Sequence, residues 1–154
     1  MENLQEVLRQ QLKICRQIEQ LAEAQKEKFT VSSIPRTDDF VKEMEKLLAE
    51  LGRLENIKEQ YLHQQNAVNV EDFISRSADS DAKGLTAKLQ AALLQTMQKL
   101  QRLGRENKDM LDRTMKYINF SVNVLTQTAA GGTYAASGGE QGMTSKKKMF
   151  DQSV

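Results

Sequence analysis

Two residues have side chains that could carry chemistry on their own, the single cysteine and the single histidine. Cys15 could act as a nucleophile or a metal ligand, and His63 as a general base or a metal ligand. Neither residue has a second cysteine or a cluster of carboxylates around it at ligand spacing. Cys15 lies in an apolar stripe, where a packed thiol is expected, and His63 is expected to be solvated near a helix end. We therefore expect no catalytic residue, no metal site and no cofactor.

Longer motifs for enzymatic chemistry are also absent from the sequence. It has no glycine-rich phosphate loop, no nucleophile elbow, no HExxH zinc motif and no paired-cysteine spacing. Its acidic residues lie mostly among lysines and arginines on helix faces, where short-range ion pairs explain them. A binding protein is therefore a better hypothesis than an enzyme.

The densest apolar cluster in the chain lies between Arg113 and Gln127. Its side chains form two rows on roughly opposite sides of a helix, and such a helix has two partners to satisfy. The cluster consists of Met115, Tyr117, Ile118, Phe120, Val122, Val124 and Leu125. We expect these seven residues to form a binding site for a partner.

A second pattern overlaps this cluster, because apolar and polar residues alternate from Ile118 to Val124, as in a half-buried strand. We favour a helix, because Met115, Ile118, Val122 and Leu125 continue the apolar face of the upstream sequence. The low helix propensity of the segment indicates that it finishes ordering on its partner.

Composition indicates an all-α protein. The 154 residues include no tryptophan and one proline, and Leu, Gln, Lys, Glu and Ala dominate. The pattern predicts an antiparallel three-helix bundle or coiled coil with a long C-terminal helix and a flexible tail. The formal net charge of +1 argues against a nucleic-acid binder.

Apolar periodicity divides the chain into one bundle over residues 1–128 and a glycine-rich tail over residues 129–154. The bundle is predicted to have helices at about 2–29, 38–65 and 82–128, with a short helix at about 70–77 that closes the core. Pro35 marks the turn of the first hairpin.

The third helix is predicted to be longer than its partners. At 1.5 Å per residue the first two helices span roughly 40 Å and the third roughly 65 Å. A straight third helix would then project beyond the hairpin from Arg113 onward and expose the apolar cluster. We expect this overhang to bind the partner, or else to pair with its own copy in a structural coiled-coil dimer.

No apolar run approaches the roughly 20 residues that span a bilayer, so no membrane span is expected. The chain opens without the charged start and apolar centre of a secretory signal, and one cysteine suits a reducing compartment. We expect a cytoplasmic protein.

One residue of the tail is out of character with its neighbours. Tyr134 is a large ring within the run Gly131-Gly132-Thr133-Tyr134-Ala135, a form suited to weak docking into a pocket. The basic triplet Lys146 to Lys148 is expected to be a solvated patch.

The order of these features resembles that of the FlgN-type flagellar export chaperones. The resemblance rests on Tyr-Ile-Asn-Phe at 117–120, Val-Asn-Val-Leu at 122–125 and Gly-Gly-Thr-Tyr-Ala-Ala-Ser-Gly at 131–138. It implies a cytoplasmic chaperone that binds hook-filament junction proteins before their export through the flagellar type III apparatus.

In that family the end of the long helix takes the helical end of the cargo, and a tail tyrosine engages the export gate. The residues of this chain that match the cargo role are Tyr117, Phe120, Val124 and Leu125, and Tyr134 resembles the gate residue. The basic triplet has no counterpart in the resemblance. An exported flagellar component is a further alternative.

Overall fold

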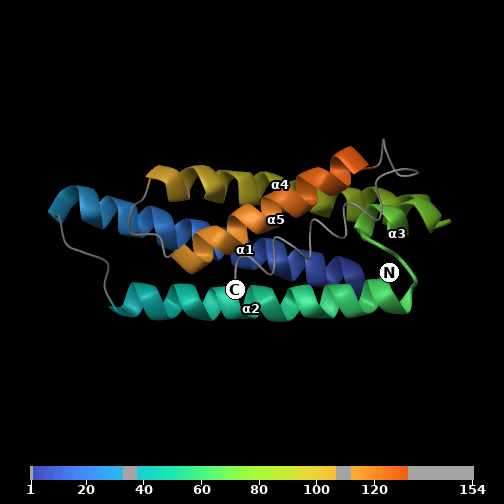
Figure 1. The fold of residues 1–154 in the computed structure, drawn as a ribbon, viewed down its shortest axis with the longest axis horizontal. Helices are drawn as coiled ribbons and strands as arrows, with labels where there is room; N and C mark the ends of the chain where they lie inside the picture. Colours follow the sequence, from blue (N-terminus) through green and yellow to red (C-terminus); the bar gives the residue numbers. More distant parts are fainter. Residues whose placement is uncertain (1, 33–37, 107–111, 132–154) are drawn as a thin grey trace.

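The structure, a computed structural model, describes residues 2–32, 38–106 and 112–131. In this part of the chain every element is a helix (Figure 1). The helices are α1 (Glu2–Ser32), α2 (Asp38–Gln64), α3 (Val70–Arg76), α4 (Ser80–Glu106) and α5 (Asp112–Gly131). The prediction of an all-helical bundle is confirmed, and residues 117–125 are helix, not strand.

The first two helices form the expected antiparallel hairpin, in which α2 runs back along α1 (Figure 1). The buried stripe of α1 includes Leu4, Leu8 and Ile18, and that of α2 includes Met44 and Leu51, all fully enclosed. These side chains recur at helical spacing, so each helix presents one continuous apolar face to the core.

The longest helix interface joins α1 to α4, and these two helices run in the same direction. Gln5 bonds Thr86 at 3.3 Å and Cys15 bonds Met97 at 3.8 Å, across sequence separations of 81 and 82 residues. At the far end Lys26 pairs with Glu106 at 2.8 Å, 80 residues away. A separation that stays almost constant along the interface is the mark of parallel helices in register.

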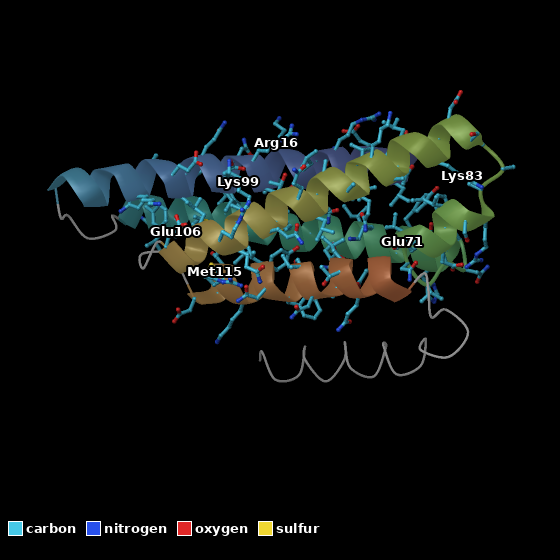
Figure 2. All side chains as sticks on the ribbon, turned by 90° about the horizontal axis from the view of Figure 1, so that it is seen from above. Arg16, Glu71, Lys83, Lys99, Glu106 and Met115 are labelled. Carbon is cyan, nitrogen blue, oxygen red and sulfur yellow. The ribbon has the colours of Figure 1, made fainter. Side chains whose placement is uncertain are left out.

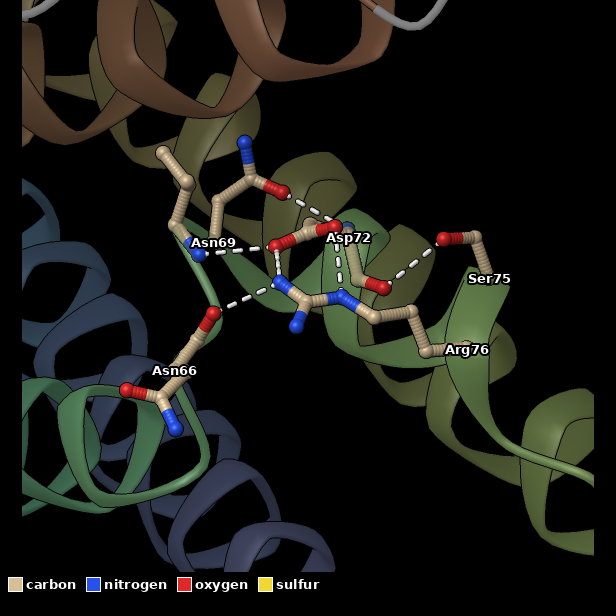
Figure 3. A network of polar contacts seen from close by, with 6 residues as sticks. Asn66, Asn69, Asp72, Ser75 and Arg76 are labelled. Carbon is tan, nitrogen blue, oxygen red and sulfur yellow. Dashed lines mark hydrogen bonds and ion pairs between the residues drawn. The ribbon is translucent and has the colours of Figure 1, made fainter.

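The short helix α3 lies at one end of the bundle, where Val70 is buried (Figure 1). Its N-cap is Asn69, whose side-chain oxygen accepts a hydrogen bond from the Asp72 amide at 2.8 Å. Arg76 donates to the Asp72 carboxylate and to the Asn66 carbonyl (Figure 3). Phe73 packs edge-on against Tyr61 with ring centroids 5.7 Å apart.

Three residues separate the end of α3 from the start of α4, and Asp79 caps the first turn of α4. The Asp79 carboxylate accepts from the amides of Asp81 and Ala82 at 3.0 and 3.1 Å. These bonds satisfy amides that have no acceptor within the helix.

The prediction of one straight helix over 82–128 is wrong. Helix α4 ends at Glu106, α5 begins at Asp112, and α5 turns back along α4 (Figures 1 and 2). The Gln101 amide donates to the Asn119 side-chain oxygen at 2.9 Å across this interface. The overhang is therefore absent, because folding back lets the apolar face of α5 be buried within the same chain.

No helix in the described ranges is both long enough and apolar enough to cross a membrane. The predicted tail over 129–154 starts within α5, which continues to Gly131, and the rest of the tail lies outside the described residues.

Candidate functional site

The seven residues of the predicted cargo site all lie on α5, but the structure divides them into two groups. Ile118, Val122 and Leu125 are buried, with 0%, 6% and 7% of their surface exposed. Met115, Tyr117, Phe120 and Val124 are half-buried. The site is therefore not the open surface that a projecting helix would offer.

The buried group is the face of α5 that packs against the bundle. Ile118, Val122 and Leu125 follow one another at spacings of four and three residues and belong to the same core as Leu93 and Leu100 of α4. Thr114 lies on this face too and is fully buried. Its hydroxyl has no hydrogen-bond partner in the structure, which costs stability at this interface.

Tyr117, Phe120 and Val124 form a second row on the edge of α5, at spacings of three and four residues. The pKa of the Tyr117 phenol is raised, chiefly by burial and then by the nearby Glu55 carboxylate of α2. The aromatic edge of α5 therefore faces α2, whereas Asn119 faces α4.

The two neighbours of α5 hold it unequally. It packs along α4 over much of its length and meets α2 at few positions. Among the described residues, the large apolar side chains that are clearly exposed are Ile57, Val68 and Leu85, and none of them belongs to α5. In this conformation α5 thus offers a partner its half-buried edge alone.

A layer of polar side chains lies inside the bundle near Tyr117. The Gln11 amide donates to the Glu55 carboxylate at 2.9 Å, and the Lys58 ammonium pairs with the same oxygen at 2.8 Å. The pKa of the Glu71 carboxyl is raised by burial, and Lys58 and Gln90 oppose that rise. A polar layer of this kind fixes the alignment of helices.

This polar layer is not among the features predicted from the sequence. The sequence does indicate that Lys58 lies on the buried face of α2, because it comes four residues after Leu54 and four residues before Leu62. For the reversal before α5, the signal was Gly104 followed by a run of polar residues.

Cys15 and His63 lie on different helices and in different surroundings. Cys15 is buried, its thiol donates to the Met97 sulfur at 3.8 Å, and burial raises its pKa to about 12. His63 is exposed in the last turn of α2. In the part of the chain that the structure describes, no three His, Cys, Asp or Glu residues gather as a metal site would require.

Tyr134, the residue expected to dock at the export gate, lies outside the described residues, and so does the Lys146 to Lys148 triplet. Their roles stay predictions.

Comparison with known families gives a match to one of them. The family described as FlgN protein matches residues 1–142, which include all five helices and Tyr134. Comparisons with curated proteins and with solved structures gave no match. Because the match covers most of the sequence, the chain belongs to the FlgN family of flagellar export chaperones.

Proposed function

We propose that this protein is a cytoplasmic type III export chaperone for hook-filament junction proteins. It binds the helical ends of these proteins, prevents their premature assembly and delivers them to the export gate. The family match supports the general role. The observation that carries the binding mode is the position of α5, an amphipathic helix at the border of the bundle that is held mainly by α4.

In the proposed mode, α5 leaves its place on α4 and pairs with the amphipathic helix of the cargo. All seven residues of the site can contact cargo only after this exchange, because Ile118, Val122 and Leu125 are buried in the free protein. The half-buried edge, with Tyr117, Phe120 and Val124, makes the first contact. Recognition is thus of the helix-in-groove kind.

The energetics favour an exchange of partners over a simple release of α5. Burying one large aliphatic side chain contributes about 1.5–3 kcal/mol, so exposing three of them to water would be strongly unfavourable. A cargo helix with a matching apolar face offsets this cost. The buried Thr114 hydroxyl, which has no partner in the docked state, lowers the cost of leaving it.

A disulfide between α4 and α5 tests the exchange. Gln101 and Asn119 are hydrogen-bonded across the interface, so the double variant Gln101→Cys, Asn119→Cys puts one thiol on each helix at neighbouring positions. Cys15 is buried with a raised pKa and will not compete in the oxidation. We expect cargo affinity, measured by calorimetry, to fall at least tenfold on oxidation and to recover on reduction.

The reduced double variant is the control for the two substitutions. If the oxidised protein binds cargo as tightly as the reduced protein, the exchange is refuted, and the half-buried edge alone must serve as the site. No binding by the unmodified protein to any hook-filament junction protein would refute the chaperone assignment itself.

The aromatic edge is tested by Tyr117→Ala and Phe120→Ala. Both variants should weaken cargo binding, because each removes an apolar anchor. Circular dichroism should show the helicity of the bundle retained, and Asn123→Ala, an exposed position on the same helix, is the matched control. Unchanged cargo affinity in both variants would remove these residues from the site.

Delivery to the export gate is assigned to Tyr134. The Tyr134→Ala variant should bind cargo normally and reduce the amount of cargo secreted into the medium. A loss of cargo affinity in this variant would contradict the division of roles between α5 and the tail.

A further inference from the structure

The face of the bundle opposite α5 carries a groove that the proposed chaperone function does not use. It lies between α1 and α4, has a volume of about 490 Å³, and is lined by Arg9, Leu12, Lys13, Arg16 and Leu89 among others. Figure 2 shows Arg16 on the side of the molecule away from Met115 of α5. The groove and the cargo helix are therefore separate surfaces.

One wall of the groove is a basic row on α1. Arg9, Lys13 and Arg16 follow at spacings of four and three residues, so they share one face of the helix, and all three are exposed. Arg9 has a loose ion pair with Glu6 at 3.7 Å. Among the described residues, no carboxylate lies within ion-pair distance of Lys13 or Arg16.

The other end of the same helix pair shows how unusual these cations are. There Lys26 pairs with Glu106 at 2.8 Å, and Lys99 pairs with Glu19 and Glu23. Near the end of α4, the charged side chains of α1 and α4 thus form ion pairs with each other. Near the groove, Lys13 and Arg16 have no such pair among the described residues.

The floor and second wall of the groove are apolar. Leu12 lies at its base, and Leu89 of α4 is half-buried beside it. Leu85 lies one turn before Leu89 on the same face and is 38% exposed. Because α1 and α4 run in parallel with residues about 81 positions apart facing each other, Leu89 lies nearly level with Arg9. Leu85 lies one turn before the basic row, next to the groove and outside its lining.

We propose that this groove binds an acidic amphipathic helix of a partner protein. The apolar row of that helix would pack on Leu12 and Leu89 in the groove and on Leu85 one turn before it, and its carboxylates would pair with Arg9, Lys13 and Arg16. The basic row spans about 10 Å at 1.5 Å per residue, which matches two turns of the partner.

The surroundings of the groove favour a helix over other anionic partners. Glu6 and Glu19 lie beyond the two ends of the basic row, so a long polyanion such as RNA would meet negative charge on both sides. The groove is also concave, with its leucines beneath the cations, whereas a membrane surface needs cations and apolar groups that protrude together.

The test uses the full chain and a synthetic capped helical peptide with a leucine row flanked by glutamates. A second peptide with lysine in place of glutamate is its charge-reversed partner. We expect the glutamate peptide to bind, with NMR shift changes at residues 9–16 and 85–89, and the lysine peptide not to bind. Affinity should fall as salt is raised, because exposed charges are screened.

The triple variant Arg9→Gln, Lys13→Gln, Arg16→Gln should bind the glutamate peptide about tenfold more weakly, as expected for three exposed charge pairs. Its matched control is Lys42→Gln, Lys46→Gln, Arg53→Gln, which removes the same charge from exposed positions on α2. Both variants should keep cargo binding at α5 and an unchanged melting temperature.

Three results would overturn the proposal. The first is that the two peptides bind equally well or that neither binds. The second is that the NMR shift changes fall on α5 and not on the α1–α4 face. The third is that anionic phospholipid vesicles or single-stranded RNA bind more tightly than the glutamate peptide at the same salt concentration. None of these results would bear on cargo binding by α5, since that measurement uses a different ligand and a different surface.

Discussion

The thiol of Cys15 links the core of this protein to pH. Its pKa is raised from about 9 in water to about 12, mainly because burial disfavours the thiolate, while the Lys58 ammonium opposes the rise. The folded state therefore retains the proton at pH values where the unfolded state has lost it. This group contributes stability that is complete below its ordinary pKa and is lost as pH rises toward the folded value.

We therefore predict that the free energy of unfolding falls by about 2 kcal/mol between pH 8.5 and pH 10.5 through this group alone. The measurement is urea unfolding at a series of pH values, with Cys15→Ala as the comparison. The alkaline slope of the variant should be shallower by that amount. Parallel slopes in the two proteins would show that the thiol is not held in its protonated form.

Lys58 provides a second test at the scale of single residues. Its side chain is 11% exposed and pairs with Glu55, which also accepts a hydrogen bond from Gln11. In a Lys58→Met variant we expect a loss of about 1–3 kcal/mol in stability, because a partly buried carboxylate would lose its counter-charge.

The control for Lys58 is Arg53, which pairs with Glu50 at the same i,i+3 spacing on α2 but with 55% of its side-chain surface exposed. Arg53→Met should leave the melting temperature unchanged. Similar losses in both variants would mean that burial does not distinguish the two pairs.

At the scale of elements, α5 is a border helix and α1 is central, since α1 packs on both α2 and α4. Ile118 of α5 and Ile18 of α1 are both completely buried. Replacing either by alanine should cost about 2–5 kcal/mol locally. We predict that the two substitutions differ in how far this loss spreads through the bundle.

Amide hydrogen exchange measures that spread. Ile118→Ala should accelerate exchange in α5 and leave α1 and α4 protected, whereas Ile18→Ala should accelerate exchange in all helices through global unfolding. Uniform acceleration in the Ile118→Ala variant would contradict a separately opening α5 and weaken the proposed exchange with cargo.

Whether a helix and its direction can be predicted from the sequence depends on the sequence pattern that the helix requires. Helices α1 and α2 leave regular apolar stripes, and α3 leaves a compact apolar group with Asn69 as a cap before it. The reversal of the chain before α5 cannot be read from the apolar periodicity, because Met115, Ile118 and Val122 continue the spacing of the apolar residues upstream. Periodicity records which face of a helix is apolar and does not record which way the chain runs.

The seven residues of the cargo site were identified for their apolar character, and three of them are used in the core of the free protein. Sequence cannot separate these uses, because a residue that binds a partner helix and a residue that binds its own bundle have the same chemistry. The groove could not be predicted from the sequence, because it depends on the register of α1 against α4, which brings Leu89 beside Arg9.

At the scale of the whole molecule, nearly all large apolar side chains of the described residues are buried or half-buried within one chain. The three clearly exposed ones are Ile57 on α2, Val68 between α2 and α3, and Leu85 on α4. Surface of this kind is normal for a monomer. We predict that the free protein has the mass of one chain, 17.5 kDa, across a wide concentration range.

Size-exclusion chromatography with light scattering makes this measurement. A mass near twice that of the chain, which returns to that of one chain in a Phe120→Ala variant, would favour the alternative of a coiled-coil protein that self-associates through α5.

The parallel pairing of α1 with α4 also constrains how this chain can be made. Each contact in that interface joins residues about 80 positions apart, as in the pair of Lys26 with Glu106. At a synthesis rate of 5–20 residues per second, an α1 residue waits roughly 4–16 s for its partner to leave the ribosome. Until then α2 is the only helix that can cover the leucines of α1, so part of the apolar face of α1 is exposed to water during synthesis.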